Sequence, residues 1–364
     1  MTHAPSKVIV VTAVLALVIV GAAFVISRTS STTTPVSSNT SNTVTTNSAT
    51  NDAPSTDTAT GNAPLYFTTM THMEGNFTDD TNEVLFDRHV TDMRWAMDLF
   101  DEYGVKLTFE SEASFAKANS NWGVNILKEV IDQGHGVGTH ADFGSGAGKT
   151  LSLSELTNDF KTNKALVDGL VGAKNNHGVS GGTGPTDWVL AASAAGFDYM
   201  DAVTGFGYLS MPMRVRPSGW TDEYIRTTTF HDPIPPELVD RLYPLLLKDA
   251  TDLVPDADPA MVIMGGDIGE LASIAEGRSN CFPDCAFDGS DVSQAESYIK
   301  EADQIRDHSQ FARLNIHIPL NLLNQKNETT LRAFLSMLKS YHDKGTVQFA
   351  TQLGSFEAYQ AWNE

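Results

Sequence analysis

Apolar and polar positions divide the chain into an N-terminal apolar run, a polar stretch and a long region of alternating patterns. In the third region, short runs rich in β-branched and aromatic residues alternate with segments whose apolar side chains recur every three or four positions. The first pattern is typical of buried strands and the second of amphipathic helices. Because the two alternate along the chain, we expect a parallel sheet joined by right-handed helical crossovers.

The alternation extends from residue 65 almost to the C-terminus. The expected strands are 65–72, 105–111, 134–142, 177–182, 197–203, 260–267, 313–321 and 346–351. The expected helices are 87–103, 122–133, 152–171, 186–195, 293–308 and 328–342. About seven strand–helix units close more readily as a barrel than as an open sheet, so the predicted fold is a distorted parallel (β/α)7-type barrel.

Residues 1–28 are predicted to form a membrane anchor or a signal segment. Val8–Ile26 is apolar and uncharged, and its roughly 19 residues suffice to cross the hydrocarbon core as a helix. Lys7 precedes the run, which favours an N-terminus in the cytoplasm and the remainder outside. A cleaved signal peptide is the alternative, with Gly21–Ala23 near the processing site. Both alternatives predict a domain outside the cytoplasm.

Residues 29–64 are rich in Ser, Thr and Asn and poor in large apolar residues, so they are predicted to be a disordered linker. Residues 65–364 form the predicted catalytic domain. The formal net charge is −21, from 24 Lys and Arg and 45 Asp and Glu residues. This excess of negative charge makes nucleic acid a poor partner, whereas a neutral or cationic polymer could bind. The charge could also be an adaptation for solubility.

The sequence has two cysteines, Cys281 and Cys285, in the segment NCFPDCAF. In an extracytoplasmic domain this spacing predicts a local disulfide bond that closes a proline-containing loop. A metal site built on the two cysteines is the weaker alternative, because no third soft ligand stands nearby.

Side chains suited to metal binding follow two of the predicted strands. His72 and Glu74 end the first strand, and His140 and Asp142 end the third with the same spacing. Residues two apart on a strand point the same way, and imidazole with carboxylate suits a divalent metal. In parallel α/β folds, functional residues lie at the C-terminal ends of the strands. We therefore expect these pairs, together with His317 from the late strand, to converge on one pocket.

Each of the remaining candidates has a structural alternative. His317 could be a hydrogen-bonded core residue, and Glu110 could cap a helix or sit in a loop. Asp267 ends another predicted strand. Trp188 and Trp220 could stack on sugar rings, although tryptophan often anchors a core or a loop.

The order of these segments resembles the polysaccharide deacetylase (NodB-type) family over most of residues 65–356. Its clearest local match is GHGVGTHAD at 134–142, which is similar to the family's GHEIG-x-H segment, where the histidine binds the metal. LNIHIP at 314–319 resembles the late strand that carries the catalytic histidine. YHDKGTVQFAT at 341–351 resembles the last helix–strand pair.

Three positions depart from the family pattern. His72 stands where an aspartate is usual, and the second histidine of the metal pair is absent near Gly144, where Asp142 could substitute. The Arg-Pro motif expected around 181–185 is also absent, and Arg216 with its following proline occurs later in the chain.

The resemblance implies a metal-dependent hydrolase that removes N-acetyl or related acyl groups from an extracellular or cell-envelope polysaccharide. A divalent cation, zinc or a similar ion, would be held by His72, His140 and Asp142. Glu74 would act as general base on the attacking water and His317 as general acid on the leaving amine. His72 and Glu74 could also exchange roles. The expected substrate-binding residues are Glu110, Trp188, Trp220 and Asp267.

Two other functions stay open on the sequence alone. A glycoside hydrolase of related barrel fold would use two carboxylates, with Glu110 and Asp267 as the candidate pair. A non-catalytic glycan-binding surface protein would explain the missing histidine and arginine of the family pattern.

Overall fold

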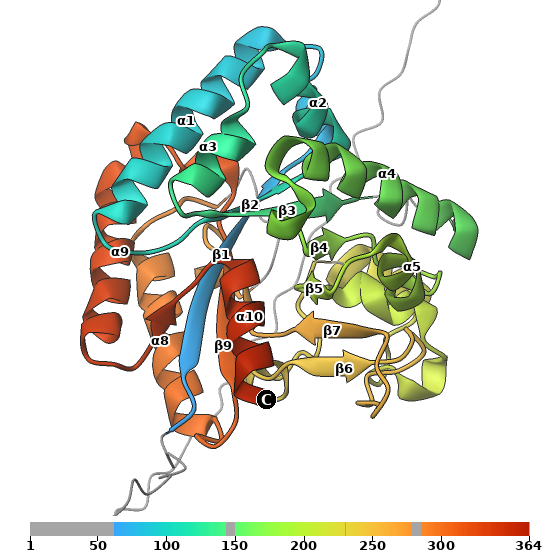
Figure 1. The fold of residues 1–364 in the computed structure, drawn as a ribbon. Helices are drawn as coiled ribbons and strands as arrows, with labels where there is room; N and C mark the ends of the chain where they lie inside the picture. The colour runs from blue at the N-terminus through green and yellow to red at the C-terminus, as the bar shows by residue number, and fades with distance from the viewer. Residues whose placement is uncertain (1–61, 143–149, 230, 278–284, 364) are drawn as a thin grey trace, which may run out of the picture. The chain divides into compact units, whose positions relative to one another are not determined.

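The structure is a computed structural model that describes residues 62–142, 150–229, 231–277 and 285–363. These residues belong to one compact unit, Ala59–Glu364. Ten strands form a central sheet in the order β6-β7-β5-β4-β3-β2-β1-β9-β8, with β10 beside β1 (Figure 1). The strands are β1 Leu65–Met73, β2 Thr108–Ser111, β3 Gly136–Ala141, β4 Gly178–Gly181, β5 Tyr199–Asp201, β6 Leu245–Leu247, β7 Met261–Met264, β8 Asp267–Glu270, β9 Ala312–His317 and β10 Gln348–Phe349.

The chain itself connects the two sides of this sheet between β7 and β8. β7 pairs with β5 while β8 pairs with β9, and only Gly265 and Gly266 separate β7 from β8. Gly266 has a φ of 95°, and a Cβ there would stand 2.1 Å from the backbone oxygen of Arg313. Glycine is therefore required where the chain turns from one neighbour to the other. Among the described strands, every pairing is parallel except that of β6 with β7. The predicted α/β barrel with a mostly parallel sheet is confirmed.

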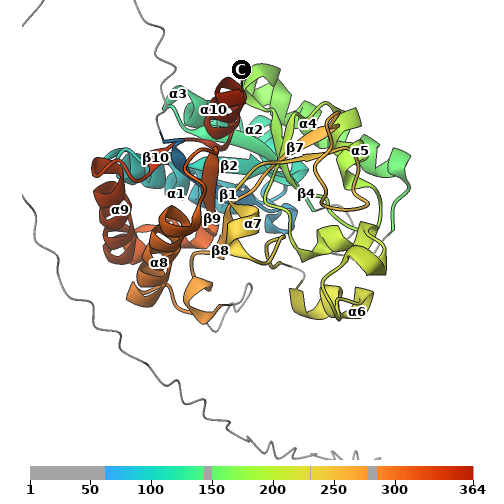
Figure 2. The ribbon, with the colours of Figure 1, turned by 90° about the horizontal axis from the view of Figure 1, so that it is seen from below.

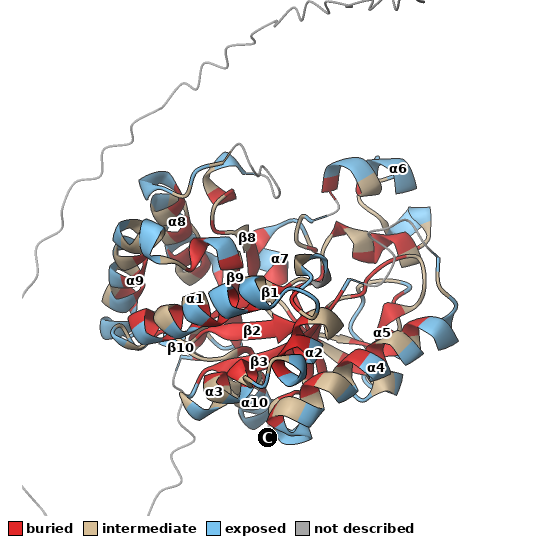
Figure 3. Ribbon diagram, turned by 90° about the horizontal axis from the view of Figure 1, so that it is seen from above, coloured by how far each residue is buried: buried red, intermediate tan, exposed pale blue. Residues whose placement is uncertain are grey.

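Helices surround the strands (Figures 1 and 2). They are α1 Glu83–Asp101, α2 Ala113–Asn121, α3 Ile126–Asp132, α4 Leu153–Val171, α5 Trp188–Ala195, α6 Asp222–Tyr224, α7 Leu238–Arg241, α8 Gly289–Ile305, α9 Glu328–Asp343 and α10 Gln352–Asn363. Figure 3 shows the buried strands at the centre and the exposed helix faces outside. This layering follows from the apolar stripe that each long helix turns towards the sheet.

Local signals in the sequence fix where the helices begin and end. Ser152 and Glu155 form a reciprocal capping box at the start of α4. Asp187 accepts a hydrogen bond from the backbone of Leu190 at the start of α5, and Gly196 ends that helix with a φ of 91°.

Six elements were not expected from the sequence, namely α2, α6, α7, α10, β6 and β8. α2 has a weak apolar pattern because alanine, serine and asparagine make up most of it, yet it buries Phe115. α10 packs Phe356 against Tyr199, with ring centroids 4.6 Å apart.

Predictions for the N-terminal region fall mostly outside the described residues. Residues 1–28, the predicted anchor or signal, and nearly all of 29–64, the predicted linker, belong to 1–61. Within the part of the chain that the structure describes, no helix has both the length and the apolar character needed to cross a membrane.

Candidate metal centre at the barrel mouth

The candidate residues come from strands that end at the same mouth of the barrel. His72 lies near the end of β1, opposite Glu110 of β2 in the strand register. His140 of β3 lies opposite Ser180 of β4. His317 is the last residue of β9. Parallel pairing brings these strand ends together. For this reason His72 and His317, which are 245 positions apart in the sequence, can share one site.

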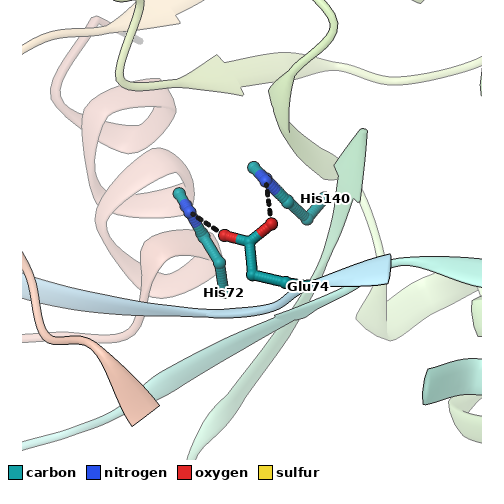
Figure 4. Close-up of side chains that lie close together, drawn as sticks. All are labelled: His72, Glu74 and His140. Carbon is teal, nitrogen blue, oxygen red and sulfur yellow. Dashed lines mark ion pairs between the residues drawn. The ribbon is translucent and has the colours of Figure 1, made fainter. Parts of the chain in front are cut away.

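His72, Glu74 and His140 form a compact group (Figure 4). The Glu74 carboxylate lies between the two imidazoles, with Oε1 3.6 Å from His72 Nδ1 and Oε2 3.7 Å from His140 Nε2. One nitrogen or oxygen of each residue lies within 4.8 Å of those of the other two. Asp142 Oδ1 is a further 3.7 Å neighbour of His140 Nε2.

The three histidines of the site form a stack with His72 in the middle. Its ring centroid lies 3.8 Å from that of His140 and 4.4 Å from that of His317. On the far side of the stack, Glu270 Oε2 lies 3.3 Å from His317 Nδ1. Nε2 of His317 is buried and has no hydrogen-bond partner among the described residues.

Carboxylates at the mouth favour a positive charge between them. Burial alone would lower the pKa of His72, but hydrogen bonds to Glu110 and Glu74 outweigh it and raise that pKa to about 10. Burial alone would raise the pKa of Glu74, but the hydrogen bond to His72 and the charge of His140 bring it to about 2. Burial lowers the pKa of His317, and the neighbouring His72 lowers it further. A proton or a cation is thus stabilised at the His72–Glu74 end of the site.

A buried layer supports the mouth from inside the barrel. Glu110 accepts a 2.6 Å hydrogen bond from Ser180 Oγ, and Ser180 Oγ lies 2.8 Å from His140 Nδ1. Below it, Arg313 donates a 2.7 Å hydrogen bond to Asp201, and both side chains are buried. Burial raises the pKa of Asp201; Arg313 opposes this and the nearby Glu110 adds to it, so that the pKa reaches about 8.

A cavity of about 480 Å³ opens over these groups. Of the predicted site residues, six line it: His72, Glu74, His140, Asp142, Asp267 and His317. The cavity therefore brings together all five residues that the sequence placed in a common pocket.

Three predicted substrate-binding residues do not line the cavity. Glu110 is fully buried beneath His72. Trp188 is also fully buried, and its indole nitrogen donates to the Gly207 carbonyl, so its prediction as a substrate contact is wrong. Trp220 packs edge-on against Tyr208, with centroids 5.0 Å apart, instead of facing the cavity.

Other predicted features lie elsewhere. Arg216 donates to the backbone of Met211 and pairs with Asp222, away from the cavity lining. Cys285 is disulfide-bonded, and its predicted partner Cys281 lies in 278–284, outside the described residues. His89 of α1 is buried, with Nδ1 2.8 Å from Asp79 Oδ1.

Sequence reasoning missed Ser180, Glu270, His231 and Arg226, which line the same cavity. Ser180 stands in the strand GVSG, where its immediate neighbours are valine and glycine and no residue suggests a site. Glu270 ends β8, a strand that becomes separate only because Gly265 and Gly266 break the extended segment. A search for polar residues at the end of every strand would have found Ser180 and Glu270.

The donor set fits a divalent cation. His140 Nε2 is buried with no hydrogen-bond partner among the described residues, although two carboxylate oxygens lie 3.7 Å away. Two ligands about 2.0–2.2 Å from a tetrahedral zinc ion lie about 3.4 Å apart. The separations of 3.6 and 3.7 Å around Glu74 are therefore close to those of two ligands on one metal ion.

The comparisons with known proteins identify the fold. No protein-family model matches the sequence, and no curated protein matches it. A solved structure from Parabacteroides distasonis, provisionally described as a glycoside hydrolase/deacetylase, is 10% identical, with a TM-score of 0.50 over 83% of this chain and 72% of that chain.

Two further solved structures are similar at lower scores. A provisionally described polysaccharide deacetylase from Mycobacterium smegmatis is 13% identical, with a TM-score of 0.49 over 84% of this chain and 96% of that chain. PdaA of Bacillus subtilis, a family 4 carbohydrate esterase, is 11% identical, with a TM-score of 0.35 over 82% and 81%. At this identity the likeness to the Parabacteroides distasonis structure shows the fold alone, and the barrel fold agrees with the resemblance seen in the sequence.

Proposed function

We propose that the chain is a metal-dependent hydrolase that removes N-acetyl or related acyl groups from an extracellular or cell-envelope polysaccharide. One observation carries the proposal: His72, Glu74 and His140 present ligand atoms within 4.8 Å of one another in a cavity of about 480 Å³. The fold of deacetylase-type barrels supports the same reaction class by analogy.

His72, Glu74 and His140 would hold the cation, with Asp142 at its open side. A bound divalent cation, zinc or a similar ion, supplies a Lewis acid for the acyl carbonyl and lowers the pKa of water. Glu74 lies between both imidazoles, which favours its role as a ligand over that of general base. The sequence had left this exchange open.

His317 would move the proton of the reaction. Glu270 holds its Nδ1, so Nε2 is the atom left to accept a proton from the attacking water and then to donate it to the leaving amine. Asp267 lines the cavity, which supports its proposed role as a contact to the sugar.

The glycoside hydrolase alternative loses one member of its predicted pair. Glu110 is fully buried and does not line the cavity, so it cannot flank a glycosidic bond bound there together with Asp267. The apolar run Val8–Ile26 supports a location outside the cytoplasm, by an anchor or after cleavage of a signal.

The test measures acetate released from an N-acetylated chitin oligosaccharide by the purified full chain. We expect release that stops on chelation, returns with Zn²⁺, and falls at least about 100-fold in His140→Gln. His177→Gln is the matched control, because His177 pairs with Asp198 away from the cavity. Reducing ends formed without metal would instead indicate a glycoside hydrolase. Glycan binding with neither turnover nor metal would indicate a surface binding protein.

A further inference from the structure

We infer that Glu110 is a positioning residue that orients both imidazole ligands of the metal centre, His72 directly and His140 through Ser180. This inference rests on the proposed metal site. Glu110 is fully buried and outside the cavity lining, so it does not touch a bound substrate. Its place comes from the strand register, which sets Glu110 opposite His72 and Ser180 opposite His140.

The direct contact determines which nitrogen of His72 faces the metal. Glu110 Oε2 lies 3.2 Å from His72 Nε2. An ionised carboxylate only accepts hydrogen bonds, so Nε2 carries a hydrogen. Nδ1 is then the ligand atom, and it is the atom that lies 3.6 Å from Glu74 Oε1.

The contact through Ser180 determines which nitrogen of His140 faces the metal. Ser180 Oγ donates its single hydrogen to Glu110 Oε2 over 2.6 Å. The same hydroxyl can therefore only accept from His140 Nδ1, which lies 2.8 Å away. Nδ1 thus carries the hydrogen, and the lone pair of Nε2 points towards Glu74 Oε2, 3.7 Å away.

One carboxylate oxygen therefore sets the orientation of two ligands on different strands. The resulting ligand set is Nδ1 of His72, Nε2 of His140 and the carboxylate of Glu74. A hydrogen bond to the far nitrogen of a metal-binding histidine fixes its ring and raises its basicity, and its loss costs about 10–100-fold in metal affinity. Because Ser180 connects the Glu110 carboxylate to the ring of His140, the orientations of the two imidazoles depend on each other.

The experiment compares the Zn²⁺ affinity of the full chain with that of Ser180→Ala and Glu110→Gln, by competition with a chromophoric chelator. We expect both variants to bind zinc about 10–100-fold more weakly than the wild type. Asp198→Asn is the control, because Asp198 pairs with His177 outside the cavity and its loss should leave affinity unchanged. Urea unfolding of each variant checks that it folds. If Ser180→Ala does not fold, Glu110→Gln still tests the inference, because it keeps the shape of the side chain.

A second readout is independent of affinity. In ¹⁵N NMR spectra of the zinc-loaded wild type, we expect the ring hydrogen of His72 on Nε2 and that of His140 on Nδ1. The opposite assignment for either ring, or unchanged zinc affinity in both variants, overturns the inference while leaving the proposed function intact. A wild type that takes up no zinc at all overturns the proposed function as well.

Discussion

Metal binding to this site should become tighter as the pH rises, because the cation must displace a proton. The pKa of His72 is raised to about 10 by its carboxylate neighbours, so the ring is almost fully protonated at pH 6.5–8. A metal ligand must be neutral, and binding therefore releases that proton. The wild type should release about one proton from His72, and part of another from His140, whose pKa is also raised.

The size of the effect follows from the proton count. One displaced proton changes the dissociation constant about tenfold per pH unit, or about 1.4 kcal/mol. Between pH 6.5 and 8, zinc affinity should rise by about 30-fold or more. Calorimetric titrations in two weakly coordinating buffers with different ionisation enthalpies count the protons. Asp198→Asn, which alters a carboxylate–histidine pair away from the cavity, should show the same slope as the wild type.

The metal-free protein should show the opposite trend in stability. The folded pKa of His72, about 10, lies above its unfolded value of about 6.5. The proton on His72 therefore stabilises the folded state fully below pH 6.5, and this contribution is lost as the pH rises towards 10. A zinc affinity that stays constant from pH 6.5 to 8, with no proton released, would refute the reasoning, because it would show that His72 is already neutral.

Three other predictions concern the reaction and the barrel. His317→Gln should lower kcat by about 100-fold or more with unchanged zinc content, since proton transfer is lost and the ligands remain; equal loss of zinc would contradict this. Arg313→Leu should cost about 3–5 kcal/mol in urea unfolding, because it leaves buried acceptors of Asp201, Gln352 and the Gly265 carbonyl without their donor; a loss below about 1 kcal/mol would count against this buried network. Gly182→Ala should destabilise by about 1–3 kcal/mol, because a Cβ would stand 2.4 Å from the Phe160 ring; a thermal melt at the wild-type temperature would show that the ring moves aside.

The residues of the site that could be predicted from the sequence are those near the C-terminal ends of strands. His72, His140 and His317 each lie at or next to the end of a strand with a clear sequence pattern. Parallel strands bring their C-terminal ends to one mouth, so the convergence of these residues follows from pattern and topology alone. The two pairs of histidine and carboxylate, His72 with Glu74 and His140 with Asp142, were the strongest chemical signal in the sequence.

The supporting residues could not be predicted because their roles arise from register and burial. Ser180 has an ordinary side chain, and only its place opposite His140 links it to Glu110. The burial of Trp188 depends on how α5 packs, which a local pattern does not reveal. Glu270 reaches His317 only because two glycines divide one extended segment into β7 and β8.

The central claim is that His72, Glu74 and His140 share one divalent cation. The most direct test is an anomalous difference map from crystals of the full chain grown with zinc, collected above the zinc absorption edge. The account predicts a single strong peak about 2.0–2.3 Å from Nδ1 of His72, Nε2 of His140 and a carboxylate oxygen of Glu74. A well-ordered site with no anomalous peak among these three atoms at saturating zinc would contradict it.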